Sequence, residues 1–310
     1  MIRGLHHITA TVGEAQPDLD CYVRALGLRL VKKTVNFDNH NVYHFYYGNE
    51  VGKPGTLMTT FPYAGQGVPK GVHGAGQITA TAFSVPANSI EFWRNRLTDL
   101  GFELRDEVEC FGDTLLSFTD PSGLVIELAG CEDDERIPWL TDDIASDSAI
   151  RGLCAPSLCI RNPETSIRFL TDVLGWQVEA VEGSRTRLSI DGDKPGNRID
   201  IVHAPDAPQA VNGLGTVHHV AMGVDDEGAQ QIVRENLLSR GVDVTPVRDR
   251  QYFQSIYFRE PGGVLFEVAT IPPGFLIDES LSSLGQGLKL PSWEEANRVS
   301  IEAGLEAVKY

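Results

Sequence analysis

The sequence predicts an α+β protein made of four copies of one module, in which a strand and a helix are followed by three strands. Three observations support this prediction: one segment recurs four times, an apolar strand and a helical pattern precede each copy, and a glycine-containing turn follows it. The recurring segment contains a helix-stop glycine followed by an alternating strand, at Gly27, Gly101, Gly175 and Gly241. Spacings of 74, 74 and 66 residues between these glycines indicate an internal repeat.

Each module is predicted to begin with an apolar strand, at 5–12, 78–85, 153–160 and 217–224. The following helix is clearest in the third module, where Asn162 caps it, Pro163 takes the first helical position and Glu164 favours the helix dipole. A turn then introduces the last strand of each module. These turns are Lys53-Pro54-Gly55, Asp120-Pro121-Ser122-Gly123, Lys194-Pro195-Gly196 and Glu260-Pro261-Gly262-Gly263.

A lone four-stranded sheet with one helix leaves its other face bare, so the modules must pair to close a core. We therefore expect the four βαβββ modules to form two cupped mixed-sheet barrels. The expected organisation is a first half at 1–131 with modules 1–63 and 76–131, an acidic linker at 132–150, a second half at 151–271 with modules 151–204 and 214–271, and a tail at 272–310. The tail is expected to hold a helix that starts near Ser292.

Composition excludes several classes of function. The chain has 310 residues, and 26 Lys and Arg against 43 Asp and Glu give a net charge of −17. Such a surface repels phosphate backbones and anionic lipids, so we expect neither a nucleic-acid nor a membrane partner. No apolar stretch approaches the roughly 20 residues that cross a bilayer, and the start of the chain leaves no room for a signal peptide. A cytoplasmic protein is the expectation.

The five cysteines suggest packed thiols rather than chemistry. They occur at Cys21, Cys110, Cys131, Cys154 and Cys159, without close pairs at metal-site spacing and without a disulfide-like pattern.

The repeats resemble those of the vicinal oxygen chelate superfamily, which includes glyoxalase I, extradiol dioxygenases and bleomycin-resistance proteins. The resemblance covers nearly the whole chain, and it implies paired modules whose first and last strands carry metal ligands. Aligned on Gly4, Gly152 and the strand ends, the first-strand positions are His7, Ala80, Ala155 and His219. The last-strand positions are Thr59, Glu127, Asp200 and Glu267.

The ligand set depends on which modules pair. If the first module pairs with the fourth, the four aligned positions in one sheet are His7, His219, Glu267 and, at the fourth corner, Thr59. The first three match the two-His-one-carboxylate triad of non-haem Fe(II) oxygenases. Pairing the third module with the fourth would give one histidine and two carboxylates. Pairing the first module with the second would leave only His7 and Glu127 as possible ligands. The first-with-fourth pairing uses the ligands best. Glu127 and Asp200 are then interpreted as relics or salt-bridged residues.

Two histidine doublets distinguish the first and fourth modules from the others. His6-His7 and His218-His219 recur at one repeat position and are the only such doublets in the chain. An isolated strand histidine is more often a hydrogen-bonded core residue, which is our interpretation of His44 and His203.

Several segments resemble, more specifically, the hydroquinone 1,2-dioxygenases of this superfamily, which open para-diols. They are Gly4-Leu5-His6-His7-Ile8-Thr9, the runs 30–38 and 43–48, Gly215-Thr216-Val217-His218-His219-Val220-Ala221, and the run 249–263 followed by Phe266-Glu267. The resemblance implies that His7, His219 and Glu267 bind Fe(II), or Mn(II), and that an aromatic diol and O2 are the substrates. It also implies a homo-oligomer.

Other residues of the site have expected roles. The resemblance places Tyr257 and Arg250 in the substrate pocket, where Arg250 could hold an anionic oxygen and Tyr257 could donate a hydrogen bond. His218 or His6 is the candidate base for the phenolic proton. Because successive side chains of a strand point to opposite faces, both members of a doublet reach one pocket only if the strand is bent or bulged.

Three alternative functions stay open. An extradiol enzyme that cleaves catechols would use the same triad. A glyoxalase-like isomerase or lyase would need a fourth protein ligand, for which the hydroxyl of Thr59 is poorly suited. A drug-binding protein of the bleomycin-resistance kind has no need of a metal triad.

Overall fold

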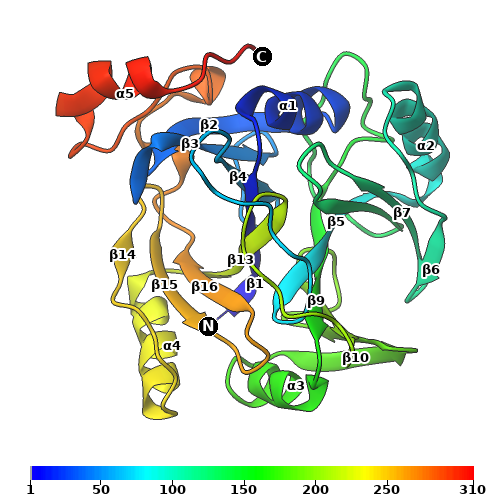
Figure 1. Cartoon of the computed structure of the whole chain (residues 1–310). Helices are drawn as coiled ribbons and strands as arrows, with labels where there is room; N and C mark the ends of the chain where they lie inside the picture. The colour runs from blue at the N-terminus through cyan, green and yellow to red at the C-terminus, as the bar shows by residue number, and fades with distance from the viewer. Residues whose placement is uncertain (1) are drawn as a thin grey trace.

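The computed structural model describes residues 2–310 and contains the four modules (Figure 1). The first module comprises β1 (Ile2–Val12), α1 (Ala15–Leu19) with a continuing π-helical turn (Asp20–Ala25), β2 (Arg29–Asn36), β3 (Asn39–Gly48) and β4 (Leu57–Pro62). The second comprises β5 (Gln77–Pro86), α2 (Ile90–Asp99), β6 (Val108–Cys110), β7 (Asp113–Thr119) and β8 (Val125–Cys131). The third comprises β9 (Gly152–Ile160), α3 (Pro163–Asp172), β10 (Gln177–Glu182), β11 (Arg185–Ser189) and β12 (Arg198–His203). The fourth comprises β13 (Thr216–Val224), α4 (Glu227–Ser239), β14 (Arg248–Asp249), β15 (Gln254–Arg259) and β16 (Leu265–Thr270).

The strands form two eight-stranded mixed sheets. The order in the first sheet is β14-β15-β16-β13-β1-β4-β3-β2, and in the second it is β10-β11-β12-β9-β5-β8-β7-β6. The first sheet therefore combines the first module with the fourth, and the second sheet combines the second with the third. The predicted α+β fold of paired modules is confirmed, and so is the pairing that the ligand positions favoured.

The first and last strands of each module occupy the centre of each sheet. In the first sheet, β1 pairs in parallel with β4 and antiparallel with β13, and β13 pairs in parallel with β16. The four strands that carry the aligned ligand positions are thus direct neighbours. The second sheet repeats this arrangement with β8, β5, β9 and β12.

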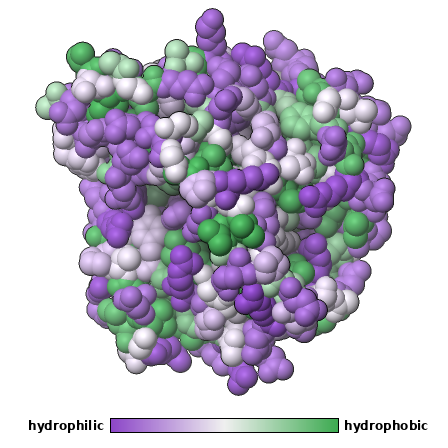
Figure 2. Space-filling model, viewed as in Figure 1, coloured by the Kyte–Doolittle hydropathy of each residue, from purple (hydrophilic) through white to green (hydrophobic). Residues whose placement is uncertain are grey.

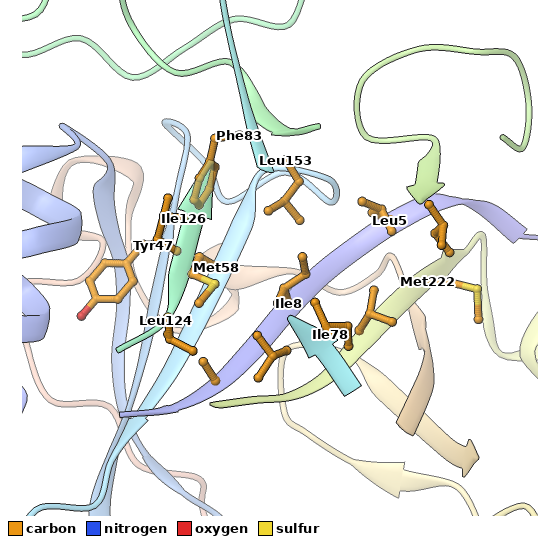
Figure 3. Close-up of a cluster of buried hydrophobic side chains, with 14 of the residues drawn as sticks. Leu5, Ile8, Tyr47, Met58, Ile78, Phe83, Leu124, Ile126, Leu153 and Met222 are labelled. Carbon is orange, nitrogen blue, oxygen red and sulfur yellow. The ribbon is translucent and has the colours of Figure 1, made fainter. Parts of the chain in front are cut away.

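The hydrophobic core lies where the central strands of the two sheets pack together. Figure 3 shows Leu5 and Ile8 of β1 gathered with Ile78 of β5 and Met222 of β13. Ile8 is fully buried, which contributes about 1.5–3 kcal/mol for a side chain of this size. Because successive residues alternate between faces, packing Ile8 into the core directs its neighbour His7 to the other face of the sheet.

The helices differ in how they begin. The carboxylate of Asp226 accepts a hydrogen bond from the amide of Ala229 and so caps α4. In α3, the proline at the helix start is present as predicted, but the side chain of Asn162 makes no capping hydrogen bond. That detail of the prediction was wrong.

The tail contacts the first module. Its regular helix α5 (Arg298–Gly304) begins later than the predicted start near Ser292. Between Ser292 and α5 the chain forms a turn followed by a 3-10 helix (Glu295–Asn297). In that turn Trp293 packs edge-on against Phe37, with ring centroids 5.6 Å apart, and Glu294 lies 3.3 Å from His40.

The surface is dominated by polar residues, as the charge of −17 requires. Figure 2 shows hydrophilic residues over most of one face, with hydrophobic residues in small separate groups. Within residues 2–310, none of the helices is both long enough and apolar enough to cross a membrane.

Candidate metal centre

Strand pairing brings the three predicted ligands together on one face of the first sheet. His7 of β1 lies opposite Ala221 of β13, and Ala221 lies opposite Glu267 of β16. His219 is two residues before Ala221 and therefore shares its face. On β1, Thr9 lies opposite His219. The three candidate ligands thus occupy two neighbouring sets of cross-strand pairs on one face of the sheet.

The three side chains are close enough to bind one ion. The Nε2 atoms of His7 and His219 lie 3.2 Å apart, and Oε2 of Glu267 lies 3.3 Å from the first and 2.8 Å from the second. The exposed fractions of His7, His219 and Glu267 are 2%, 5% and 0%. This group is therefore buried and converges on one point.

The carboxylate of Glu267 provides a test of whether a metal fits here. Its Oε1 accepts a hydrogen bond from Ser255, whereas its buried Oε2 accepts no hydrogen bond of regular geometry despite the nearby imidazoles. A buried carboxylate oxygen without a partner costs free energy. Two imidazole nitrogens and one carboxylate oxygen are the donors that non-haem Fe(II) sites use. The donor set therefore fits a divalent metal ion.

Each doublet places the imidazole of its first histidine next to the imidazole of the second. In β1 the strand register shifts between Leu5 and His7, and in β13 it shifts around His218, so each first histidine occupies a bulge. The Nδ1 atoms of His6 and His7 lie 2.9 Å apart, and those of His218 and His219 lie 2.7 Å apart. The bulges that both members would need to reach one site are present.

Burial keeps the first histidine of each doublet neutral. The pKa of His6 falls to about 3 because of burial and the neighbouring His7, and the pKa of His218 falls to about 3 because of burial and His219. A neutral His6 can accept a hydrogen bond from Nδ1–H of His7, which leaves the Nε2 lone pair of His7 directed at the site. The same applies to His218 and His219.

The charge of Glu267 is stabilised by its two histidine neighbours. Burial alone would raise its pKa, but His7 and His219 outweigh burial and hold the pKa well below its ordinary value. The carboxylate is therefore ionised at neutral pH, as a metal ligand must be.

The site opens into a cavity of about 550 Å³ within the first sheet. His7, His219 and Glu267 line it, and so does His218, whereas His6 does not. Its apolar walls are formed by Phe37, Phe61, Val68, Phe253 and Leu265. A cavity of this size with apolar walls and a few polar groups is typical of small-molecule sites.

Arg250 and Tyr257, the two residues expected in the pocket, lie together on the wall of this cavity. Nε of Arg250 donates to the hydroxyl of Tyr257 at 3.2 Å, and its Nη2 donates to Asp38 at 3.1 Å. Burial and the charge of Glu267 raise the pKa of Tyr257, so its hydroxyl keeps its proton. Because the oxygen of Tyr257 accepts from Arg250, that proton is free to be donated elsewhere.

Sequence reasoning missed two cavity residues, His44 and Asp38. His44 is hydrogen-bonded, as expected, but it lines the cavity and its Nε2 lies 3.0 Å from the hydroxyl of Thr59. That hydroxyl also lies 2.8 Å from the hydroxyl of Thr9. Thr59 is thus engaged by two partners. The sequence offered one indication of this position: His44 is two residues from Tyr46 on the same strand, so both side chains lie on one face, and Tyr46 also lines the cavity.

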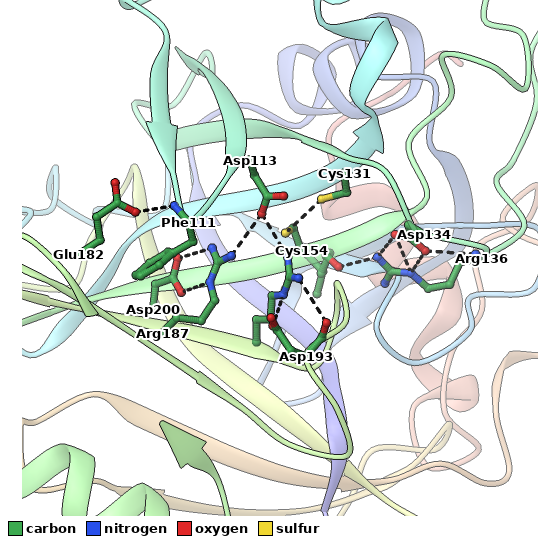
Figure 4. A network of polar contacts seen from close by, with 12 residues as sticks. Phe111, Asp113, Cys131, Asp134, Arg136, Cys154, Glu182, Arg187, Asp193 and Asp200 are labelled. Carbon is green, nitrogen blue, oxygen red and sulfur yellow. Dashed lines mark hydrogen bonds and ion pairs between the residues drawn. The ribbon is translucent and has the colours of Figure 1, made fainter. Parts of the chain in front are cut away.

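The equivalent position in the second sheet is filled by an ion pair. The aligned residues there are Ala80, Glu127, Ala155 and Asp200. The guanidinium of Arg187 donates to both oxygens of Asp200, at 2.8 and 2.9 Å (Figure 4). The interpretation of Asp200 as a salt-bridged residue is confirmed.

The residues that match a known protein family coincide with the internal repeat. The model of the Glyoxalase/Bleomycin resistance protein/Dioxygenase superfamily matches residues 4–128 and 152–268. Each match spans two consecutive modules, so the family covers both sheets and all three side chains of the metal centre.

Curated relatives have similar sequences over almost their whole length. MhqO of Bacillus subtilis (strain 168), provisionally named a ring-cleaving dioxygenase, is 42% identical over 97% of this chain and 95% of its own. The chlorohydroquinone/hydroquinone 1,2-dioxygenase of Sphingobium indicum is 35% identical over 93% of this chain and 91% of its own.

Solved structures show the same fold. A provisionally named dioxygenase from Bacillus subtilis subsp. subtilis strain 168 superimposes with a TM-score of 0.95 at 42% identity, over 99% of this chain and 98% of its own. Glyoxalase I from Zea mays, at 16% identity, has a TM-score of 0.64 over 86% of this chain and 92% of its own. The chain belongs to the glyoxalase/bleomycin resistance protein/dioxygenase superfamily and, within it, to the ring-cleaving dioxygenases.

Proposed function

We propose that this enzyme is an Fe(II)-dependent dioxygenase that opens the ring of an aromatic diol with O2, and that a substituted hydroquinone is its substrate. The observation that carries the proposal is the convergence of His7, His219 and Glu267 on the wall of a largely apolar cavity. The name of the Sphingobium relative supports a para-diol rather than a catechol.

The proposed ligands are His7, His219 and Glu267. When bound, a ferrous ion would supply open coordination positions and a path for electrons from the diol to O2. The protein supplies the anionic charge of Glu267, which offsets part of the charge of a divalent cation. His6 and His218, whose Nδ1 atoms lie next to those of His7 and His219, would orient the two ligand imidazoles.

His218 is the better candidate for the proton acceptor. It lines the cavity, whereas His6 contacts His7 from outside the cavity. Burial keeps its imidazole unprotonated at neutral pH. To accept a phenolic proton it needs a free ring nitrogen, so its Nδ1 would have to release the contact with Nδ1 of His219, or its Nε2 would have to pass on its own proton.

Arg250 and Tyr257 are proposed to bind the oxygen substituents of the ring. The guanidinium would oppose the negative charge that forms when the diol loses a proton, in a cavity where burial strengthens that interaction. The hydroxyl of Tyr257 has its acceptor side occupied by Arg250 and can donate to a substrate oxygen. The aromatic side chains of Phe61 and Phe253 would pack against the ring.

Oxygen consumption tests the proposal directly. The protein, loaded anaerobically with Fe(II), would be mixed with hydroquinone, methyl- and chlorohydroquinones, catechol and 3-methylcatechol, and O2 uptake and ring-opened products would be measured. We expect one O2 per molecule of diol and faster turnover of the hydroquinones. Faster turnover of the catechols would favour the extradiol alternative, and no uptake with any diol would contradict the proposal.

The glyoxalase-like alternative is less well supported by the site. The hydroxyl of Thr59 at the fourth corner is hydrogen-bonded to His44 and Thr9. Isomerisation of a hemithioacetal in the absence of O2 would be the result that favours it.

A further inference from the structure

A second group of metal-ligating side chains lies in the other sheet, and the proposed function does not use it. Cys131 is the last residue of β8, Cys154 lies in β9 and Asp113 is the first residue of β7. Their ligand atoms lie within 4.8 Å of one another. Figure 4 shows the two sulfurs facing each other next to Asp113. The spacing of the cysteines in the sequence does not indicate this pair, because strand packing joins positions 23 residues apart.

We propose that Cys131, Cys154 and Asp113 form a binding site for a thiophilic divalent cation of the Zn(II) type. The two sulfurs lie 3.8 Å apart. In a tetrahedral site with Zn–S bonds of about 2.3 Å, two thiolate sulfurs are about 3.8 Å apart. The sulfurs are therefore already at the separation that one shared ion requires. A carboxylate oxygen of Asp113 is the third ligand, and water completes the tetrahedron.

Asp113 is held in place for this role by two arginines. Its Oδ2 accepts hydrogen bonds from Arg187 at 3.2 Å and from Arg198 at 3.1 Å. Both bonds end on the same oxygen, so neither guanidinium occupies Oδ1. Carboxylates that bind metals are commonly oriented by hydrogen bonds of this kind.

The charges around the cluster allow a cation despite the arginines. Arg187 is also paired with Asp200, and Arg198 is also paired with Asp193. Together with Asp113, three carboxylates face two guanidinium groups, which leaves one net negative charge. A divalent cation that replaces the two thiol protons leaves this net charge unchanged, so binding adds no repulsion to the cluster as a whole.

Cys131 provides access to the site. It lines a cavity of about 380 Å³ together with Pro86, Ala87, Glu132 and Arg151. The sulfur of Cys154 lies within hydrogen-bonding distance of the sulfur of Cys131, on the far side of it from this cavity's lining. A metal ion bound by the two sulfurs would displace both thiol protons.

A bound ion would connect three strands of the second sheet. Two of them, β7 and β8, precede residues 132–151 in the chain, and the third, β9, follows these residues. These residues join the second module to the third and contain neither helix nor strand. Binding to the folded protein would therefore raise the melting temperature. This site is independent of the proposed oxygen chemistry.

Titration of the reduced, Fe(II)-loaded protein with Cd(II) under argon tests the inference. Cadmium thiolates have an ultraviolet charge-transfer band that imidazole and carboxylate ligands do not produce, so Cd(II) at the His7 site goes unseen. We expect a band that saturates at one equivalent in the wild type. Cys131→Ser and Cys154→Ser should each lose it. Cys159→Ser, which alters a buried thiol of the same strand β9, is the matched control and should keep it.

Asp113→Asn tests the third ligand. It should keep the band but weaken Cd(II) binding by about tenfold or more, the scale on which groups around a metal site change affinity. Wild-type protein that shows no band although all five thiols react after denaturation would overturn the proposal. A band that survives in both Cys131→Ser and Cys154→Ser would do the same.

Thiol protection gives a second readout that needs no variant. Cd(II) should protect Cys131 and Cys154 from alkylation in the wild type, as mapped by mass spectrometry of the peptides. Equal protection of Cys21 and Cys159 would contradict a dedicated site.

Discussion

The Nε2 atoms of His7 and His219 lie 3.2 Å apart, although the two residues are 212 positions apart in the chain. The antiparallel pairing of β1 with β13 produces this approach, and the parallel pairing of β13 with β16 adds Glu267. The candidate metal centre therefore depends on the pairing of the first module with the fourth.

Glu267→Gln should abolish metal binding. The amide has nearly the same shape but no negative charge, so two neutral imidazoles would remain to hold a divalent cation. We expect iron content to fall from about one per chain to background and activity to fall more than about 100-fold. The matched control is Glu127→Gln, the aligned position of the second sheet, which should keep its iron. Full iron content in Glu267→Gln, measured by elemental analysis, would refute the ligand assignment.

Tyr257→Phe should slow turnover without releasing metal. The substitution removes the hydroxyl that accepts from Arg250 and is proposed to donate to the substrate. Loss of a hydrogen bond to a charged group is worth about 1.5–3 kcal/mol, or roughly 10- to 150-fold in kcat/KM. Iron content and melting temperature should stay near the wild-type values. Unchanged kcat/KM would remove Tyr257 from the proposed mechanism.

Asp18 should make the protein less stable as pH rises. Its Oδ2 accepts from Tyr47 at 2.6 Å and from Thr60 at 2.5 Å, while its buried Oδ1 has no partner. Burial raises its pKa from 3.8 to about 7. The folded state thus keeps a proton that the unfolded state releases above about pH 4, and stability is lost as pH rises from there to about 7.

Asp18→Asn should remove this pH dependence, because the amide imitates the protonated acid. Between pH 5 and pH 8 the variant should gain about 2–3 kcal/mol relative to wild type in urea unfolding. Asp20→Asn, a more exposed neighbour in the chain, serves as the control and should follow the wild-type curve. Parallel curves for wild type and Asp18→Asn would show that Asp18 titrates normally.

Lys32 should anchor the tail to the first sheet. It is fully buried, and its ammonium donates to the carbonyl of Phe275 at 3.2 Å and to the carboxylates of Asp278 and Glu279. Lys32→Met leaves two carboxylates without their cation, so we expect a loss of about 3–5 kcal/mol in the free energy of unfolding. It should also speed proteolysis within 272–310.

The neighbouring Lys33 provides the control for that change. Its ammonium lies 4.9 Å from the ring centroid of Tyr310 on a partly exposed surface. Lys33→Met should therefore cost less than about 1 kcal/mol. Equal losses of unfolding free energy in the two variants would mean that the buried ion pairs of Lys32 do not stabilise the fold more than the exposed contact of Lys33 does.

The repeat predicted much of the site because equivalent strand positions lie at equivalent places in each module. His7, His219 and Glu267 could be aligned from the strand ends and from glycines before the first and last strands, and only one pairing of modules placed all three in one sheet. The difference between His6 and His218 could not be predicted. It depends on the bulges of β1 and β13, which leave His218 on the cavity wall and His6 off it, next to His7.

The close approach of Cys131 and Cys154 shows the same limit. Each lies in a strand with ordinary apolar alternation, and nothing in their spacing of 23 residues indicates that their sulfurs meet. Likewise, alternation along β3 permitted His44 to face either the core or the cavity, and the curvature of the first sheet placed it on the cavity.

By itself, the sequence determined the module, its fourfold recurrence and the residue types at each ligand position, because these depend on local periodicity, turn residues and strand alternation. Only the tertiary structure decided which side chains converge, since convergence depends on sheet order, register shifts and curvature, which sum contacts between residues far apart in the chain. The candidate metal centre of the first sheet and the thiol pair of the second are both products of that long-range packing.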